Sequence, residues 1–566
     1  MLKRLTQKLN YVIGPIALFG FVLLLLEQSS LLEQHPALIR RINLSMLGVF
    51  AVDVTLNWIS GSKDRAYLRT HWFDLVVFIP LIQFFYAPPA STLSVILRQT
   101  ALVAMLISRT RRVKNFITLF SPKPTQLMLM SFLGVIICGT VLLMMPSATA
   151  SGERTTLLNA FFTATSATCV TGLIVHDTAT HFSLFGQMVI LILIQIGGLG
   201  IMTFSVALAM LMRRSLSMKN QSIMQDVLDH DTLHEAKRLV GFIVSMTFLL
   251  ETIGAILLFY RWHPLFPSPF ETAWHALFHS VSAFCNAGFS TFSDSLMRFS
   301  NDTPTSLTIG GLIVLGGVGF VVINDLYKAL RDRLFLRRKR RHKFRIQSRL
   351  ALGWTGGLIV TGTALAYWIE RNHLLKEMSY DHALLVSLFQ SISTRTAGFN
   401  SCEIGFLQPA TLLIFIILMF IGACPGGTGG GIKTTTPAIL WAVIRAGFHR
   451  RAQTELYRRT IPLEVVQKAV MILCASLLLV CGAVILMVIF EPGKKLIDLL
   501  FETVSAFGTT GLSTGITSSL SKSGRILIIL IMFFGRLGAL TIGFAFVLRE
   551  RHPAKYSYSE ERIMIG

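Results

Sequence analysis

Four stretches of the chain are variants of one another: FTATSATCVTGLI over residues 162–174, FHSVSAFCNAGFS over 278–290, FQSISTRTAGFN over 389–400 and FETVSAFGTTGLS over 501–513. Each begins with phenylalanine and carries a glycine followed by Leu or Phe. These glycines, Gly172, Gly288, Gly398 and Gly511, are 116, 110 and 113 residues apart. Such regular spacing is typical of internal repeats, so the chain from about residue 120 onward is predicted to be four copies of one unit.

The repeats set the predicted domain boundaries. We expect an N-terminal module over residues 1–118 and four units over 119–235, 236–346, 347–460 and 461–566. The phenylalanine lies ten residues before the glycine in units one, two and four, but nine before it in unit three. The corresponding loop of unit three is therefore predicted to be one residue tighter.

The composition indicates an integral membrane protein. Of the 566 residues, 52% are hydrophobic and only 14% are charged, and the mean hydropathy is +0.62. A formal charge of +23 would suggest nucleic acid in a soluble domain. Here the lysines and arginines gather between alternate apolar runs, at 109–123, 213–238, 328–349 and 445–468. By the positive-inside rule these loops face the cytoplasm, and no nucleic-acid partner is expected.

Apolar stretches long enough to cross a bilayer number about twelve, at about 20 residues each. An even number of spans places both termini on one side, which the basic loops identify as the cytoplasm. The spans are predicted at 11–26, 42–60, 71–87, 92–108, 126–145, 182–212, 240–260, 305–327, 349–369, 408–445 (interrupted), 465–490 and 525–548.

Each unit reads as a span, a short segment rich in small and hydroxyl residues, a glycine and a second span. The short segment cannot cross a bilayer, so it must re-enter. Non-helical backbone at membrane depth is tolerated only inside protein or along a water-filled path. Glycine permits backbone angles that point successive carbonyls at one axis, and a ring of carbonyls replaces the hydration shell of a cation. A single such loop would be read as a turn between helices, but four copies favour a pore for a monovalent cation.

The predicted selectivity filter keeps one glycine per unit and lacks the second glycine of the TVGYG filter. Its candidate ion-binding residues, with K⁺ at the glycines, are Cys169, Val170, Thr171, Gly172, Cys285, Asn286, Ala287, Gly288, Arg395, Thr396, Ala397, Gly398, Gly508, Thr509, Thr510 and Gly511.

A second repeated pattern lies in the span after each filter: GGLG at 197–200, GGVG at 316–319, GGTG at 426–429 and GRLG at 535–538. In unit four Arg536 thus takes a glycine's place in an apolar run. A charge at that depth costs roughly 3 kcal/mol or more unless it faces water or a partner. We expect Arg536 to point into the conduction path below the filter and to repel cations. The alternative is an arginine at a helix interface, paired with an acid or with carbonyls.

In unit three the second span is broken by the sequence CPGGTGGGIK at 424–433, which cannot stay helical. We predict a mobile gate loop under the filter. A phosphate-binding loop is the competing interpretation, but its Gly-Lys-Thr spacing and preceding strand are missing. The candidate gate residues are Gly426, Gly427, Thr428, Gly429, Gly430, Gly431, Lys433 and Arg536.

With these motifs the chain from about residue 120 to 566 resembles the potassium-uptake superfamily of Trk, Ktr and HKT transporters, and within it the Ktr type of membrane subunit. The resemblance implies a potassium path of four fused units, a homodimer with one pore per subunit and a gate loop at the position of the glycine-rich segment. It also implies a cytosolic ring that binds adenine nucleotides and controls the gate. A glycine in all four filters goes with potassium preference in this superfamily, whereas a serine in one goes with sodium permeability.

The N-terminal module weakly resembles a voltage-sensor-like four-helix domain. Only Arg98 lies well inside its fourth span, whereas a sensor needs arginines at three-residue intervals through the membrane. A structural or regulatory bundle is favoured.

The predicted fold is therefore an all-α integral membrane protein with four span–pore-loop–span repeats around a pseudo-fourfold cation pore, preceded by a four-helix membrane bundle. The predicted function is potassium uptake across a bacterial-type inner membrane. The chain is not expected to be an enzyme or to hold a covalent cofactor; K⁺ is the transported ion, and Na⁺ is a possible coupling or activating ion. The alternatives are a sodium-permeable channel of the same fold and a secondary transporter of an organic solute.

Overall fold

The computed structural model describes residues 124–211, 233–334, 344–451 and 453–538, together with Thr55. The four predicted spans of the N-terminal module lie outside these residues. The described part is mostly helical with almost no strand, as predicted. Its one β-ladder is a short antiparallel hairpin, in which Glu455 pairs with Thr460 and Leu456 with Arg459.

The described elements repeat one pattern: a first span, a short helix that precedes the glycine, and a second span. Unit one comprises α7 (Pro124–Leu143), η2 (Pro146–Ala148), α8 (Leu157–Thr168) and α9 (Leu184–Leu211). Unit two comprises α11 (Leu233–Trp262), η3 (His263–Leu265), α12 (Pro269–Phe284), η4 (Met297–Phe299), α13 (Thr303–Val318) and α14 (Phe320–Leu334).

Units three and four follow the same order. Unit three comprises α15 (Ile346–Glu370), α16 (Tyr380–Ser393), η5 (Ile404–Phe406), α17 (Pro409–Phe420) and α18 (Thr435–Phe448), followed by the hairpin strands β1 (Glu455–Leu456) and β2 (Arg459–Thr460). Unit four comprises α19 (Leu463–Phe490), α20 (Leu496–Gly508), η6 (Thr517–Ser519) and α21 (Lys522–Leu537).

Several of these helices are long and apolar enough to cross a membrane. Within the described residues they are 240–265, 346–370 and 463–490, and α13 with α14 forms a fourth span if the bent pair is counted as one. The three single helices match the predicted spans at 240–260, 349–369 and 465–490, and the bent pair lies over the predicted span at 305–327. Shorter apolar helices occur within the predicted spans at 126–145, 182–212 and 408–445.

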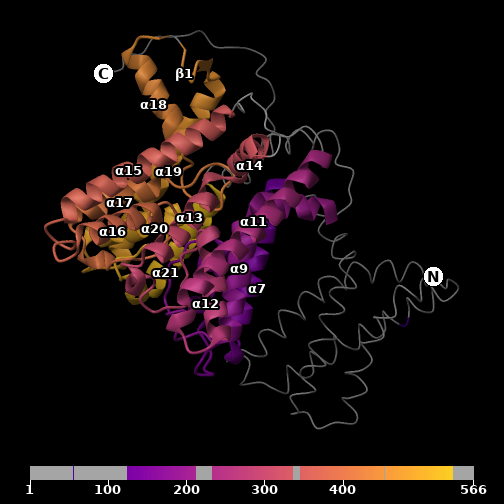
Figure 1. The fold of residues 1–566 in the computed structure, drawn as a ribbon, viewed down its shortest axis with the longest axis vertical. Coiled ribbons are helices and arrows are strands. Elements are labelled where there is room, and N and C mark those ends of the chain that lie inside the picture. Colours follow the sequence, from indigo (N-terminus) through magenta and orange to yellow (C-terminus); the bar gives the residue numbers. More distant parts are fainter. Residues whose placement is uncertain (1–54, 56–123, 212–232, 335–343, 452, 539–566) are drawn as a thin grey trace.

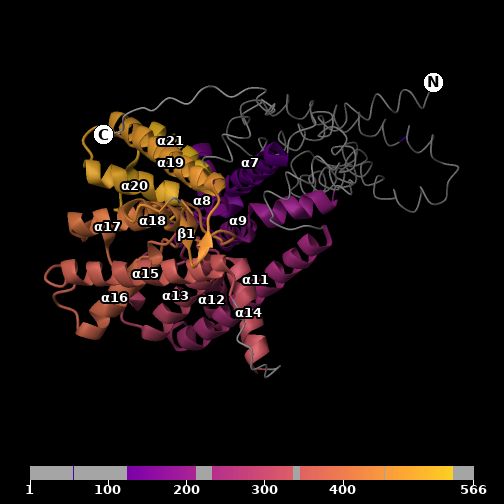
Figure 2. The same ribbon diagram turned by 90° about the horizontal axis from the view of Figure 1, so that it is seen from above.

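The four units follow one another around a centre (Figure 2). The second span of each unit packs against the short helix of the next: α9 on α12, α13 on α16 and α17 on α20. The circle closes because α21 of unit four packs on α8 of unit one. Figure 1 shows α18 and β1 projecting from one end of this bundle. The packing produces the pseudo-fourfold arrangement that the repeats predict.

The repeat phenylalanines hold the short helices in the core. Phe162, Phe278 and Phe501 are fully buried and Phe389 is 2% exposed. Burying one such side chain stabilises a fold by about 1.5–3 kcal/mol. This explains why the motif begins with the same aromatic residue in all four units.

The second span of unit two is broken, whereas the sequence predicted one continuous span over 305–327. Helices α13 and α14 meet at an angle of 107° at Gly319, whose φ is +96°. A β carbon there would lie 2.6 Å from the Pro425 carbonyl oxygen. The helix therefore turns at Gly319 and leaves room for the loop of unit three. Gly538 ends α21 with a similar conformation, at φ +85°.

Candidate filter and gate

The four repeat glycines form a closed ring. All have left-handed backbone angles, with φ of +91° at Gly172, +71° at Gly288, +77° at Gly398 and +90° at Gly511. A β carbon on Gly172 would lie 2.5 Å from the Ala287 carbonyl oxygen, and one on Gly288 would lie 2.6 Å from that of Ala397. In the same way Gly398 faces the Thr510 carbonyl, and Gly511 faces that of Thr171. Four carbonyls, one from each unit, therefore surround one axis.

The residue two positions before each glycine is also left-handed, although none is glycine. These residues are Val170, Asn286, Thr396 and Thr509, with φ of 55°, 61°, 66° and 49°. Non-glycine residues adopt this conformation only when the surrounding structure holds them there. The alternation turns successive peptide groups toward the same side, which is the arrangement that a carbonyl-lined filter needs. The structure thus brings the sixteen predicted filter residues together, and all but the partly exposed Gly288 are buried.

One serine in every short helix forms a hydrogen bond with the filter strand, the extended segment that ends at the residue after the ring glycine. These serines are not among the residues predicted from the sequence. Gly172 and Gly511 donate their N–H groups to Ser166 and Ser505, each at 3.1 Å. In units two and three the serine hydroxyl donates to the carbonyl of the residue after the glycine: Ser282 to Phe289 at 2.7 Å and Ser393 to Phe399 at 2.6 Å. The signal was present, because each serine lies four residues after the repeat phenylalanine.

The main chain around these serines explains the shorter repeat of unit three. In units one, two and four the residue before the glycine donates its N–H to the serine carbonyl five residues back. In unit three Ala397 donates to Ser393, four residues back, at 3.0 Å. The loop is one residue tighter, as predicted.

A second set of polar residues braces the strand beyond the glycines. They follow the repeat phenylalanine directly in units two, three and four. His279 Nε2 lies 2.9 Å from the Ser290 hydroxyl, and Gln390 Nε2 donates to Ser401 at 3.1 Å. Glu502 accepts hydrogen bonds from the hydroxyls of Ser513 and Thr517. These contacts fix the far side of the filter strand in three units.

Substitution of one of these serines tests whether its hydrogen bond stabilises the filter. Ser393→Ala leaves the buried Phe399 carbonyl without its donor, which costs about 1–3 kcal/mol. We expect a lower unfolding temperature in detergent and weaker discrimination between Rb⁺ and Na⁺ in uptake. Thr361→Ala is the control, because Thr361 bonds the Gly357 carbonyl on an exposed helix face. Equal behaviour of the two variants in both measurements would contradict the brace.

The loop between α17 and α18, residues 421–434 and hereafter the gate loop, lies against three filter strands. Thr428 donates its N–H to the Gly316 carbonyl at 3.1 Å, and its hydroxyl lies 3.3 Å from the Asn286 amide. Gly430 donates its N–H to the Thr509 hydroxyl at 3.0 Å. A β carbon on Gly429 would collide with the Thr396 hydroxyl. The loop therefore occupies the space directly beside filter strands two, three and four.

The gate loop contains three further glycines, Gly426, Gly427 and Gly431. A β carbon on Gly427 would lie 2.7 Å from the Gly317 carbonyl oxygen, and Gly431 lies against Gly422 and Gly508. Gly426 differs from the first glycine of the other GGxG patterns. Gly197, Gly316 and Gly535 each face the last carbonyls of a short helix, whereas Gly426 is exposed and has no neighbour within 4 Å of its β-carbon position. Gly426 therefore contributes a left-handed turn of the backbone, with φ of +75°, to the loop. Its carbonyl accepts the N–H of Phe320 at 3.0 Å.

Three buried or half-buried cations hold carbonyls of the gate loop. Lys433 Nζ donates to the Gly429 carbonyl at 2.6 Å, and Arg395 Nη2 donates to that of Gly422 at 3.4 Å. Arg536, 9% exposed, donates from Nη1 to Thr428 and from Nη2 to Gly197. None of the three forms an ion pair with an acid within the described residues.

The contacts of Arg536 match one of the two interpretations of its sequence context, and its place in the conduction path stays a prediction. It is paired with carbonyls, as the helix-interface alternative expects. Those carbonyls belong to the gate loop and to α9 of unit one, so the side chain bridges from unit four across the region below the ring. Arg395 was predicted only as a filter residue, but its side chain reaches the gate loop.

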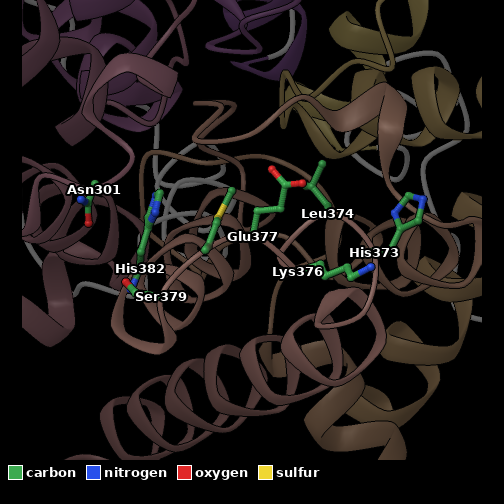
Figure 3. A pocket seen from close by; sticks show the side chains of 8 residues that line it. Asn301, His373, Leu374, Lys376, Glu377, Ser379 and His382 are labelled. Carbon is green, nitrogen blue, oxygen red and sulfur yellow. The ribbon is translucent and has the colours of Figure 1, made fainter.

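A cavity of about 730 Å³ lies elsewhere, beside the segment between α15 and α16. Its lining includes His373, Lys376, Glu377 and His382, and the labelled side chains are spread around it without converging on one point (Figure 3). It shares no residue with the ring or the gate loop. The ring and the gate loop are therefore the candidate site, and the carbonyls of the ring are of the kind that bind a dehydrated monovalent cation.

The chain is similar to known cation transport proteins. A model of the TrkH cation transport protein family matches residues 94–556. The chain is 39% identical over 450 residues to the Ktr system potassium uptake protein B of Vibrio alginolyticus, covering 78% of this chain and 94% of that protein. It is 34% identical to the potassium/sodium uptake protein NtpJ of Enterococcus hirae, covering 78% and 97%. The crystal structure of the potassium transporter TrkH from Vibrio parahaemolyticus is similar in fold, with a TM-score of 0.58, 18% identity, and coverage of 85% and 97%.

Proposed function

Because the chain belongs to the TrkH family of cation transport proteins, we propose that it takes up potassium through the glycine ring and that the gate loop closes the path below the ring. The observation that carries the proposal is the ring itself. Each left-handed glycine faces a carbonyl of the next unit, and the fourth faces the first. Carbonyl oxygens in such a ring replace the hydration shell of K⁺ without a carboxylate ligand.

The protein is a membrane transporter and not an enzyme, as its potassium-uptake relatives indicate. Its second spans begin directly after the filter loops, and the gate loop follows the end of α17. The gate loop thus lies at the opposite end of α17 from the filter loop that precedes this helix. The positive-inside rule assigns that end to the cytoplasm, because the basic residues between α18 and α19 lie beyond it. An ion would reach the ring from outside and meet the gate loop last.

We also propose a location and partners for the chain. We place the chain in a bacterial-type inner membrane with both termini in the cytoplasm, as a homodimer with one pore per subunit. A cytosolic nucleotide-binding ring would dock on the basic loops and move the gate loop, and Na⁺ would serve as a coupling or activating ion. The name Ktr system, carried by the Vibrio alginolyticus relative, denotes a system in which protein B is one part.

Cation uptake by a potassium-uptake-deficient cell tests the proposed function. We expect the chain, expressed with a cytosolic Ktr-type regulatory subunit, to restore growth at low potassium and to take up K⁺ and Rb⁺ in preference to Na⁺. Uptake of Na⁺ at equal or higher rate would identify a sodium channel of the same fold. Surface-expressed protein that carries none of these ions with the regulator present would refute the proposal.

A further inference from the structure

Glu251 places a carboxyl group in the middle of α11, where its side chain is only 2% exposed. An acid at this depth of a membrane costs roughly 3 kcal/mol or more unless it has a partner, so such residues usually serve ions or substrates. Within the described residues no lysine, arginine or histidine forms an ion pair with Glu251. In its ionised form Glu251 therefore has no counterion among the described residues.

The contacts of Glu251 place it directly behind the filter strand of unit two. Gln195 of α9 donates from Nε2 to Glu251 Oε2 at 3.2 Å. The thiol of Cys285, the first filter residue of unit two, lies 3.7 Å from Glu251 Oε1 and 3.6 Å from Gln195 Oε1. The backbone is held as well, because Ser280 of α12 donates its hydroxyl to the Glu251 carbonyl at 2.6 Å.

The positive charges near the filter suggest what this carboxyl group does. Arg395, Lys433 and Arg536 hold the gate loop through carbonyls, so their positive charges are not neutralised by described acids. Three cations below the ring would lower the occupancy of the ring by K⁺. A negative charge behind the filter opposes that effect, and in a medium of low dielectric it acts over several ångströms.

We propose that Glu251 sets the cation affinity of the filter by supplying the countercharge for the bound potassium ion. This inference rests on the proposed function. Glu251 acts through the filter strand and does not touch the ion: Cys285 separates the carboxylate from the ring. The residue is therefore a positioning residue that acts by its charge.

A charge swap between Gln195 and Glu251 tests the inference, because the side-chain oxygens of both residues lie equally close to the Cys285 thiol. Glu251→Gln removes the charge and nearly preserves the shape. Gln195→Glu combined with Glu251→Gln returns one carboxylate to the same pocket from the neighbouring helix. Glu370→Gln is the matched control: Glu370 is another buried acid, 2% exposed, but it accepts the Gln408 N–H at the start of α17, away from the filter.

The measurement is Rb⁺ uptake over a range of concentrations in the potassium-uptake-deficient cell, with surface expression and melting temperature of each purified variant recorded. We expect Glu251→Gln to raise the half-saturating Rb⁺ concentration about tenfold, the swapped double variant to return it to within about threefold of the parent, and Glu370→Gln to leave it unchanged. An unchanged half-saturating concentration in Glu251→Gln would overturn the inference while leaving potassium uptake in place. If the swapped variant is expressed and stable but does not restore the affinity for Rb⁺, the lower affinity of Glu251→Gln is caused by altered packing. That result also overturns the inference. Absence of any uptake by the parent chain is a failure of the proposed function instead.

Discussion

Gly288→Ala is expected to reduce potassium uptake by about 100-fold or more, while the protein still reaches the membrane. The new β carbon would lie 2.6 Å from the Ala397 carbonyl oxygen and 3.0 Å from the Gly398 α carbon. Both atoms belong to backbone, which cannot give way as a flexible side chain does. The left-handed φ of +71° adds about 1–3 kcal/mol of strain for any other residue. The substitution therefore displaces one carbonyl of the ring and spoils the cation site.

Gly356→Ala is the control for this prediction. Gly356 lies in α15, and its β-carbon position has no neighbour within 4 Å. Alanine favours helix over glycine by about 1 kcal/mol, so this variant should keep full uptake and gain slight stability. The measurement is initial Rb⁺ uptake normalised to surface protein. Parental uptake by Gly288→Ala would show that the glycine ring is not the ion path.

Arg536→Ala is expected to raise cation flux, by about tenfold in the absence of any regulatory partner. The arginine ties the gate loop to unit one, since its two terminal nitrogens donate to the Thr428 and Gly197 carbonyls. Its removal deletes a positive charge below the ring and frees the loop at Thr428. Both effects lower the barrier that a cation meets on leaving the filter.

Two further variants separate these effects. Arg536→Lys keeps the charge but has a single nitrogen for two carbonyls, so its flux should lie between those of the parent and Arg536→Ala. Arg525→Ala is the control on the same helix, because Arg525 bonds Asn159 and Ser518, remote from the gate loop. Flux is measured as ²²Na⁺ and ⁸⁶Rb⁺ uptake into liposomes that contain the purified protein. A stable Arg536→Ala protein whose flux equals or falls below the parent's would reject the barrier.

Much of the architecture follows from local pattern in the sequence. Apolar runs of membrane length mark the spans, because a bilayer admits few other structures. The four glycine motifs mark the re-entrant loops and their equivalence. Pro425 and the glycines around it mark the interruption of the second span in unit three, since proline and consecutive glycines do not continue a helix. The tighter loop of unit three is visible as one missing residue.

Other features depend on contacts between residues far apart in the chain and have no local pattern. The sequence predicted a continuous span over 305–327, because Gly319 sits in an apolar run where a single glycine is usually tolerated. The break occurs because the gate loop of unit three occupies the space beside Gly319, more than 100 residues along the chain. The side chain of Arg395 likewise turns from the filter to the Gly422 carbonyl, which a linear motif does not indicate.

The sequence by itself therefore determined the fold class, the order of the repeated motifs, and which glycines form the ring, since each depends on residue type and spacing within one unit. Only the tertiary structure decided the closure of the ring, the carbonyls that Arg536 and Lys433 hold, and the position of Glu251 behind Cys285. The closure of the ring and the contacts of Arg536 depend on how one unit meets the next, and the contacts of Lys433 and Glu251 depend on how the chain folds back within its unit. The carboxyl of Glu251 lies near the thiol of Cys285 because α11 packs against α12 within unit two, and Gln195 joins them because α9 of unit one packs against both helices.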